Sequence, residues 1–582
     1  MFILRNNDKI ILQTIIFMVV LYAWISFLSS LFGIFYPIFI WIIWLIICTI
    51  LFKKNILAFT KPTKYFLIYI LIAFSFSLFI AFFTVPTIFS GRDQGSLAEA
   101  SMRLAQQHSL IQHTPESDIF FNIYGHGKAL NFPGFFYTAD GGLITQFPLP
   151  YIAYLGGFYG IFNIMGLIIA NFILLFTFII AITSIAMQFV NQRYTFAFLT
   201  ILLSSFSIGW FAKFTLSENF TAMLFWSALT LYFSLKKSTT NTNFILFIFT
   251  ISLLLFSRIE GIWFFFIFLF LLLHNRTTQI FIKKDLWWYA FFPSTILFTI
   301  ICAVAIMNSP FILTMTKVLI GTSQNVTHSI SFLNKISYLF SIYAIYGLLL
   351  PLIIAGTASL VAISNKRYRK IILPLIIVFP LTIYYIFPHI SSDHPWMLRR
   401  FVFALLPATI LTSVIFISYI RSTTIVHKTI KYTLIIILFI TNIPAFIFFI
   451  TYAENVNLYT QTSQIAKNFK NNDLILVDKN AMGNGWSMIT NPLRLNHKRA
   501  VYFFNPHDFD KINTDAFEHV FLITSNQNEK IYTDILHNKM RYITKYIIHT
   551  NQLPSSEIKT FLPIFPQKQK ITVEGTIYEL KK

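Results

Sequence analysis

Long apolar runs recur along the chain and leave few architectures open to it. Several of them approach twenty residues, the length that an α-helix needs to cross a bilayer core of about 30 Å. Of the 582 residues, 56% are hydrophobic and only 11% are charged. The runs are continuous and do not alternate with polar residues, which argues against a transmembrane barrel. Because backbone groups in lipid must be bonded within their own helix, the sequence predicts a polytopic α-helical membrane protein.

The apolar segments also predict how often the chain crosses the bilayer. Lysines gather in short loops, for example at Lys53 and Lys236, and mark one side as cytoplasmic under the positive-inside rule. Four segments separate the external loop at Asp93 from Lys236, so one segment within 148–211 must be short, re-entrant or fused with its neighbour. We therefore expect about 13 membrane-spanning helices. The segments lie at 10–31, 34–52, 65–89, 148–163, 164–190, 195–211, 216–235, 242–257, 259–274, 286–306, 335–363, 371–388, 401–420 and 432–451.

The charge balance and the first apolar run exclude two other interpretations. A net charge of +22 would suit a nucleic-acid partner, but the basic residues cluster in loops between apolar runs, so we expect none. The run from about Ile10 is too long for a signal peptide and lacks a small-residue cleavage site. It predicts a retained helix with a cytoplasmic N-terminus. The two cysteines lie inside apolar runs and say nothing about disulfides.

The end of the chain changes character at about Thr451. Three short apolar stretches at 474–478, 500–504 and 519–525 have the composition of buried strands, and a helix-like stretch at 458–470 precedes them. This alternation predicts a small α/β domain. The predicted organisation is two N-terminal helices and a cytoplasmic loop (1–64), a transmembrane domain (65–450) with a large external loop (90–147), and a soluble extracytoplasmic α/β domain (451–582).

Two acidic residues stand where the third apolar segment leaves the predicted membrane. Glu99 closes the sequence "SLAE" (96–99), which fits a capping box with Ser96 as the N-cap. Asp93 lies outside that box, and a lone aspartate in a loop is most often simply solvated. Capping and chemistry are therefore both open roles for these carboxylates.

Other charged residues gather on the same predicted side. Arg258 and Glu260 flank a tight turn and either close it as an ion pair or contribute to a site. Arg399 and Arg400 begin a helix at the outer face, against the inside bias of basic residues, with contact to lipid headgroups as the alternative. Lys128 in the long loop is either solvated or in contact with a substrate.

Three further polar residues precede that pair of arginines. Asp393, His394 and His389 include the side-chain types of a divalent-metal site, although hydrogen-bonded loop residues are the more common role for such a group. Glu218 begins another helix, where capping is the simpler role and a place in the cavity the alternative. The sequence establishes no cofactor, and a divalent metal is left open.

Four motifs in this order resemble the GT-C membrane glycosyltransferases. Within that superfamily they are most similar to bacterial relatives of the protein O-mannosyltransferases and the lipid A aminoarabinose transferase. The resemblance covers about 65–450. The motifs are "GRDQGSLAEASMRLAQ" (91–106), "QFPLPYIAYLGGFYGIFN" (146–163), "SRIEG" (257–261) and "DHPWMLRRF" (393–401).

The resemblance implies roles for particular residues. Asp93 matches the family's essential acidic position after a transmembrane helix, and Glu99 matches a further acidic position of the loop helix. Gln94 stands where the family often has a second acidic residue. Gln146 stands near the place where relatives such as the aminoarabinose transferase have a lysine. The first departure weakens the case for a metal site formed by two neighbouring acidic residues. The second means that other basic residues must bind the phosphate of the donor.

The implied reaction is an inverting transfer from a sugar linked to a polyprenyl phosphate, in the bacterial inner membrane, to an extracytoplasmic lipid, polysaccharide or protein. A carboxylate takes the proton of the acceptor hydroxyl, and positive charge stabilises the departing phosphate. We expect Asp93 and Glu99 to be catalytic. For the phosphate we expect Arg399 or Arg400 first, Arg258 second and then Lys128. The expected further lining of the cavity is Glu260, Asp393, His394 and Gln146.

Two other functions use the same lipid-linked substrates. A transporter or flippase should carry charges at mid-membrane on broken helices of two related halves. In this chain the ionisable residues gather at one face and no related halves are evident. A polymerase or ligase of surface polysaccharide shares the lipid donor but transfers a whole glycan, and the sequence leaves it as an alternative.

Overall fold

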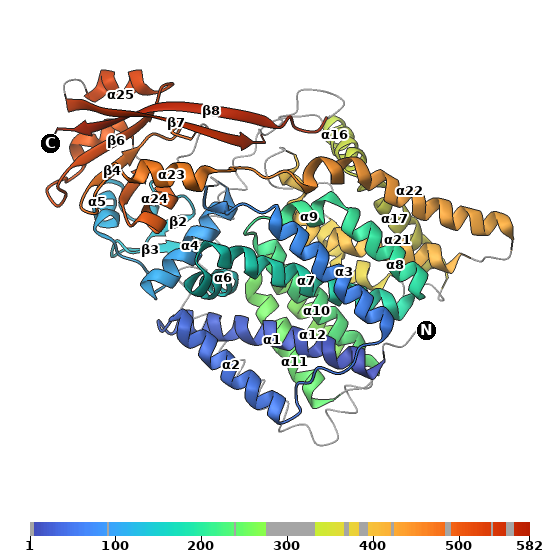
Figure 1. The fold of residues 1–582 in the computed structure, drawn as a ribbon. Helices are drawn as coiled ribbons and strands as arrows, with labels where there is room; N and C mark the ends of the chain where they lie inside the picture. The colour runs from blue at the N-terminus through green and yellow to red at the C-terminus, as the bar shows by residue number, and fades with distance from the viewer. Residues whose placement is uncertain are drawn as a thin grey trace.

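A helical body and a C-terminal β-sheet make up the computed structural model of the chain (Figure 1). It describes residues 5–89, 92–237, 240–274, 332–365, 372–382, 394–420, 424–482, 490–503, 505–536, 539–553 and 564–581. Among these residues, four helices are long and apolar enough to cross a membrane, or seven if each of three bent helix pairs is one span. The expected number of about 13 crossings stays a prediction, and the segment expected at 286–306 lies outside the described residues.

The first three helices follow the predicted apolar segments. They are α1 (Asn6–Leu31), α2 (Pro37–Lys53) and α3 (Lys64–Phe82). The Asp8 carboxylate accepts hydrogen bonds from the Thr63 backbone N–H (2.8 Å) and hydroxyl (2.9 Å), which ties the start of α1 to the start of α3. Helices α1 and α3 therefore begin on the same side of the helical body. The end of α1, the start of α2 and the end of α3, which precedes Asp93, lie on the opposite side. We call this side of the helical body the Asp93 side.

The segment 92–147, for which we keep the name external loop from its predicted position, folds into its own small structure. It follows η1 (Thr87–Phe89) and contains α4 (Asp93–Gln107), α5 (Pro115–Tyr124) and an antiparallel sheet of β1 (Gly127–Lys128), β2 (Phe135–Tyr137) and β3 (Leu143–Thr145). A capping box between Thr114 and Ser117 and a proline in the first turn set the start of α5. Helix α4, which begins at Asp93, is therefore part of a loop that has helices and a small sheet of its own.

Helix α6 (Leu149–Phe162) is a short helix within 148–211, the range in which one short, re-entrant or fused segment was expected. Its 14 residues span about 21 Å, less than the about 30 Å of a bilayer core. It starts at the end of the external loop, and Gly160 near its other end packs on Pro37 at the start of α2, so both of its ends lie on the Asp93 side. A left-handed residue, Asn163 (φ 51°), then turns the chain into α7.

The next helices form the centre of the body. They are α7 (Ile164–Phe189), α8 (Gln192–Ser204), α9 (Phe206–Ala212), α10 (Ser217–Lys237), α11 (Asn241–Ser257) and α12 (Ile259–Leu273). Helices α8 and α9 form one of the bent pairs, with an angle of 56°. In Figure 1, α6 lies between α4 and α7, and α7 packs against α3 and α10.

The last helices bring the C-terminal half alongside the first. They are α16 (Phe332–Ile345), α17 (Leu349–Ser364), α18 (Leu373–Val378), η3 (Phe379–Thr382), η4 (Trp396–Leu398), α20 (Arg399–Val402), α21 (Leu405–Tyr419) and α22 (Ile425–Ile450). Helix α22 packs on α8 and α9. Its last carbonyls accept hydrogen bonds from the ammonium of Lys213, which directly follows α9. A cation at a helix C-terminus stabilises the unpaired carbonyls there.

The end of the chain is an α/β domain, as predicted. The three expected strands are confirmed as β4 (Leu474–Val477), β5 (Ala500–Phe503) and β6 (Val520–Ser525), which pair in parallel. A long hairpin that the sequence did not predict, β7 (Met540–Gln552) and β8 (Gln569–Leu580), extends the sheet to the order β5-β4-β6-β8-β7. The other elements are α23 (Leu458–Ala466), α24 (Thr490–His497), η5 (Pro506–Lys511) and α25 (Glu529–Leu536).

The C-terminal domain rests on the external loop. Figure 1 shows its sheet, in orange and red, beside α4 and α5. The Gln106 amide donates to the Leu495 carbonyl (2.9 Å), and the Tyr124 hydroxyl donates to the Asp508 carboxylate (2.9 Å). The helix that carries Asp93 is therefore held from one side by α6 and from another by the C-terminal domain.

Candidate active site

Five charged side chains from distant parts of the chain meet on the Asp93 side. They are Asp93, Glu218, Arg258, Glu260 and Arg399, and we call them the carboxylate–arginine cluster. Each lies at or next to the start of a helix: α4, α10, α12 or α20. All three carboxylates fall in the first turn of their helices, where the positive end of the helix dipole favours a negative charge.

The cluster is a chain of ion pairs. Asp93 Oδ2 lies 2.6 Å from Arg399 Nη2, and Arg399 Nε lies 3.7 Å from Glu218 Oε1. The same Glu218 oxygen lies 2.8 Å from Arg258 Nη1. Arg258 Nε and Nη2 donate to the two oxygens of Glu260 at 3.0 and 3.2 Å. Glu218 thus stands between the two arginines.

Burial divides the cluster into an inner and an outer part. The side chains of Glu218 and Glu260 are 3% and 5% exposed, and that of Arg258 is 13% exposed. That of Asp93 is 41% exposed, so it is the member of the cluster that an arriving molecule can reach. With three carboxylates and two arginines the cluster carries one net negative charge. Arg258 is held by two buried carboxylates and by the Ser217 hydroxyl (2.9 Å).

Glu99 does not join this cluster. Helix α4 begins at Asp93, so the expected N-cap at Ser96 is wrong, and the Ser96 hydroxyl donates instead to the Pro133 carbonyl (2.8 Å). The buried Glu99 carboxylate accepts from Arg103 Nε (2.8 Å) and pairs with Arg494 of α24. Six residues along a helix separate it from Asp93 by about 9 Å. Glu99 therefore joins the loop helix to the C-terminal domain.

The other expected site residues take several places. Arg400 follows Arg399 on α20 with a partly buried side chain. His394 is buried, with Nδ1 2.9 Å from the Tyr346 hydroxyl. The exposed Lys128 lies on β1, and among the described residues no ion pair joins it to the cluster. The Gln146 backbone N–H donates to the Gly134 carbonyl (2.9 Å). Asp393 and His389 lie outside the described residues.

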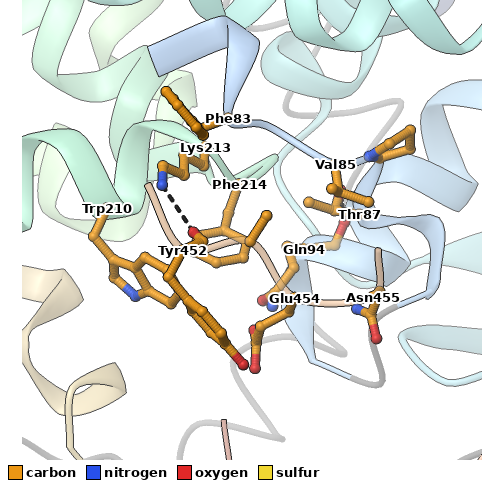
Figure 2. Close-up of a pocket in the computed structure, with 12 residues that line it drawn as sticks. Phe83, Val85, Thr87, Gln94, Trp210, Lys213, Phe214, Tyr452, Glu454 and Asn455 are labelled. Carbon is orange, nitrogen blue, oxygen red and sulfur yellow. Dashed lines mark hydrogen bonds between the residues drawn. The ribbon is translucent and has the colours of Figure 1, made fainter. Parts of the chain in front are cut away.

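A small cavity lies directly beside the start of α4. Figure 2 shows Gln94, Lys213, Tyr452 and Glu454 along its wall, and its free volume of about 20 Å³ suits a water molecule and not a sugar. The Lys213 ammonium donates to the backbone carbonyls of Phe449 (3.1 Å), Ile450 and Tyr452 (2.9 Å). This contact joins the end of α9 to the end of α22.

Glu454 is a charged wall residue that sequence reasoning missed. Its Oε1 accepts from the Leu553 backbone N–H (3.0 Å). Burial raises the pKa of this carboxyl to about 7, although the hydrogen bond and the charge of Arg92 act in the opposite direction. Lys213 was missed as well. A lysine at the end of an apolar segment that is predicted to be on the outer side departs from the inside bias, and that signal was available in the sequence.

Of three comparisons with known proteins, only the one with solved structures gives a match. No protein-family model matches the chain, and no curated protein matches it. Among solved structures, ArnT from Cupriavidus metallidurans in the apo state is similar, with 11% sequence identity and a TM-score of 0.47. The match covers 89% of this chain and 98% of that one. A likeness of this degree assigns no role to any residue of the chain.

Proposed function

We propose that the chain is an inverting glycosyltransferase that moves a sugar from a polyprenyl-phosphate-linked donor to an extracytoplasmic acceptor. The observation that carries the proposal is the pairing of Asp93 with Arg399 at 2.6 Å, with Asp93 the more exposed partner. A carboxylate and a guanidinium side by side are the two groups that such a transfer requires. One takes a proton from the acceptor, and the other binds the phosphate of the donor.

The ion pair between Asp93 and Arg399 is one in which a donor phosphate can replace the carboxylate as the partner of Arg399. A donor phosphate that binds Arg399 takes the place of Asp93 and frees its carboxylate. The acceptor hydroxyl then attacks the anomeric carbon and gives its proton to Asp93. The bond between the anomeric carbon and the phosphate oxygen breaks at the same time, and its electron pair leaves with the polyprenyl phosphate. Arg399 stabilises the negative charge that grows on that oxygen.

The other residues of the cluster fit supporting roles. Arg258 already has two carboxylate partners, so it would have to abandon buried charges in order to bind phosphate. We therefore place Arg258 and Glu260 in the support of Glu218, which in turn orients Arg399. This changes the order expected from the sequence: Arg399 comes first, with Arg400 beside it as the next candidate.

The proposed reaction also indicates where in the cell the protein lies. The lipid tail keeps the donor in the bilayer, so its phosphate lies near the membrane surface. We place the protein in the bacterial inner membrane with the Asp93 side and the C-terminal domain outside. The acceptor is a lipid, a polysaccharide or a protein of that compartment.

The test is release of polyprenyl phosphate by the purified protein from a panel of polyprenyl-phosphate sugars. Asp93→Asn should reduce turnover by roughly 10²–10⁴-fold, the usual loss for a general base. Asp118→Asn, an exposed aspartate on α5, is the matched control and should keep full turnover. Near-normal transfer by Asp93→Asn removes Asp93 from the mechanism. Movement of the intact donor across vesicles without release would show a flippase instead.

A further inference from the structure

We propose that the C-terminal domain holds one divalent transition-metal ion between Asp473, Glu518 and His519. Asp473 directly precedes β4, while Glu518 and His519 directly precede β6. These two strands are parallel neighbours, so the residues before them lie side by side at one edge of the sheet. The site is separate from the carboxylate–arginine cluster and does not depend on the proposed function.

The ligand atoms have the spacing of a coordination sphere. One nitrogen or oxygen from each of the three side chains lies within 4.8 Å of the other two. Glu518 Oε1 and His519 Nε2 are 3.6 Å apart. Two ligands at about 2.0–2.1 Å from a tetrahedral zinc ion are separated by roughly 3.4 Å. A small adjustment of the exposed Glu518 and the partly exposed His519 would bring these atoms onto one ion.

Asp473 supplies the observation that points to a ligand. Its side chain is buried, with the residue 1% exposed. Oδ2 accepts from the Lys470 backbone N–H (2.7 Å), whereas Oδ1 is buried and has no hydrogen-bond partner among the described residues. A buried carboxylate oxygen without a donor is costly. A cation at this edge of the sheet would give it a partner.

A second carboxylate orients the histidine. His519 Nδ1 lies 3.0 Å from Glu579 Oε1 on β8. When Nδ1 carries the proton and donates it to Glu579, the lone pair of Nε2 faces Glu518 and the proposed ion. Histidine ligands commonly donate their other ring nitrogen to a carboxylate in this way, and the partner fixes the tautomer.

The donor set selects the kind of metal. One imidazole nitrogen and two carboxylates suit Zn²⁺ and related first-row ions, whereas Ca²⁺ and Mg²⁺ prefer oxygen ligands alone. Three protein ligands leave a fourth tetrahedral position for water.

A salt-bridge network is the competing explanation of the same residues. Lys470 Nζ lies 3.4 Å from Glu518 Oε1, and its side chain is 70% exposed and free to swing away. The two explanations differ in what the removal of Lys470 does. A metal ion competes with the ammonium for Glu518, so Lys470→Ala should tighten metal binding. If these residues form only an ion-pair network, the Lys470→Ala variant should show no zinc binding.

The experiment is calorimetric titration of the metal-stripped, full-length protein with Zn²⁺. The parent should bind one equivalent with a rise in the melting temperature, and His519→Ala and Glu518→Gln should lose both effects. Glu579→Gln should weaken binding by about 10–100-fold, the usual effect of losing an orienting partner. His549→Ala is the matched control, because His549 is an exposed histidine on β7 of the same domain.

Three results overturn the proposal. They are a parent that takes up no zinc, a parent whose uptake survives both His519→Ala and Glu518→Gln, and a Lys470→Ala variant that binds zinc more weakly than the parent. None of these results bears on glycosyl transfer, because the titration needs no donor or acceptor.

Discussion

Asp93 and Arg399 form an ion pair at 2.6 Å, and under the proposed function a donor phosphate replaces Asp93 as the partner of Arg399. Arginine offers a planar fork that matches phosphate and stays charged at any working pH. Consecutive residues of a helix point about 100° apart, and on α20 it is Arg399 that meets Asp93. Arg400 must therefore face another direction.

Arg399→Ala should weaken donor binding and slow the chemical step, since phosphate charge grows in the transition state. Arg400→Ala, its neighbour and control, should change both by much less. The measurements are donor affinity and single-turnover rate for each purified variant. Equal losses in the two variants would mean that the phosphate site is shared, and unchanged values in both would move it away from α20.

The partly buried carboxyl of Glu454 predicts a pH dependence of stability. Its pKa is raised to about 7 in the folded protein, above the ordinary value of 4.5 for a glutamate side chain. Between these values the folded state holds a proton that the unfolded state has lost. The free energy of unfolding should therefore fall as pH rises from about 4.5 to about 7, by at most about 1.4 kcal/mol per pH unit from this group.

Glu454→Gln keeps an acceptor for the Leu553 N–H and removes the titration. The difference in melting temperature between this variant and the parent should grow in the variant's favour from pH 5 to pH 7.5. A difference that stays constant across that range would show that Glu454 has an ordinary pKa.

At the scale of elements, helix α4 is fixed at two points that have different purposes. Its first residue belongs to the carboxylate–arginine cluster, and its middle is tied by Glu99 to Arg103 and to Arg494 of the C-terminal domain. Both guanidinium groups lie over the Phe132 ring, at 5.3 Å (Arg103) and 5.1 Å (Arg494) from its centroid. Cation–π contacts of this kind add to the ion pairs in a site shielded from water.

Glu99→Gln should therefore act on stability more than on chemistry. It leaves two buried guanidiniums without their carboxylate, a change that typically costs about 3–5 kcal/mol. A double-mutant cycle with Arg494→Met should give a coupling of about 0.5–3 kcal/mol. The exposed pair Lys539 and Asp510 is the control and should couple by less than about 1 kcal/mol.

Turnover by the folded Glu99→Gln protein decides between the two roles of Glu99. It should stay well above that of Asp93→Asn, because Glu99 does not contact the cluster. A variant as stable as the parent and as inactive as Asp93→Asn would show that Glu99 takes part in the reaction.

Most helices could be predicted because a helix that crosses a bilayer needs a minimum length. Three strands could be predicted because buried strands have a characteristic apolar composition. The crossing count predicted a short, re-entrant or fused segment somewhere within 148–211, and the short helix α6 lies in that range. The partners could not be predicted, because they depend on how distant helices pack. Glu218 was expected as a cap, with a place in the cavity as the alternative, and it stands between two arginines. Lys213 meets carbonyls more than two hundred residues away. The hairpin β7–β8 was missed because its strands mix polar and apolar residues and contain no continuous apolar run.

At the scale of the whole molecule, the C-terminal domain and the external loop form one side of the protein. If that side is extracytoplasmic, a protease site inserted at the exposed Asn513 should be cut in intact spheroplasts. A site inserted at the exposed Asn55, between α2 and α3, should be protected until the membrane is permeabilised. The reverse pattern would invert the proposed topology.

The ion pair between Asp93 and Arg399 has a consequence for biogenesis, because its members come from opposite halves of the chain. A ribosome delivers the acidic loop to the membrane long before the arginine has been synthesised. A nascent or truncated product therefore has the carboxylate without its cationic partner and cannot hold a donor phosphate between them. Under the proposed function, the donor site is complete only after α20 has been inserted, when about two thirds of the 582 residues have been translated.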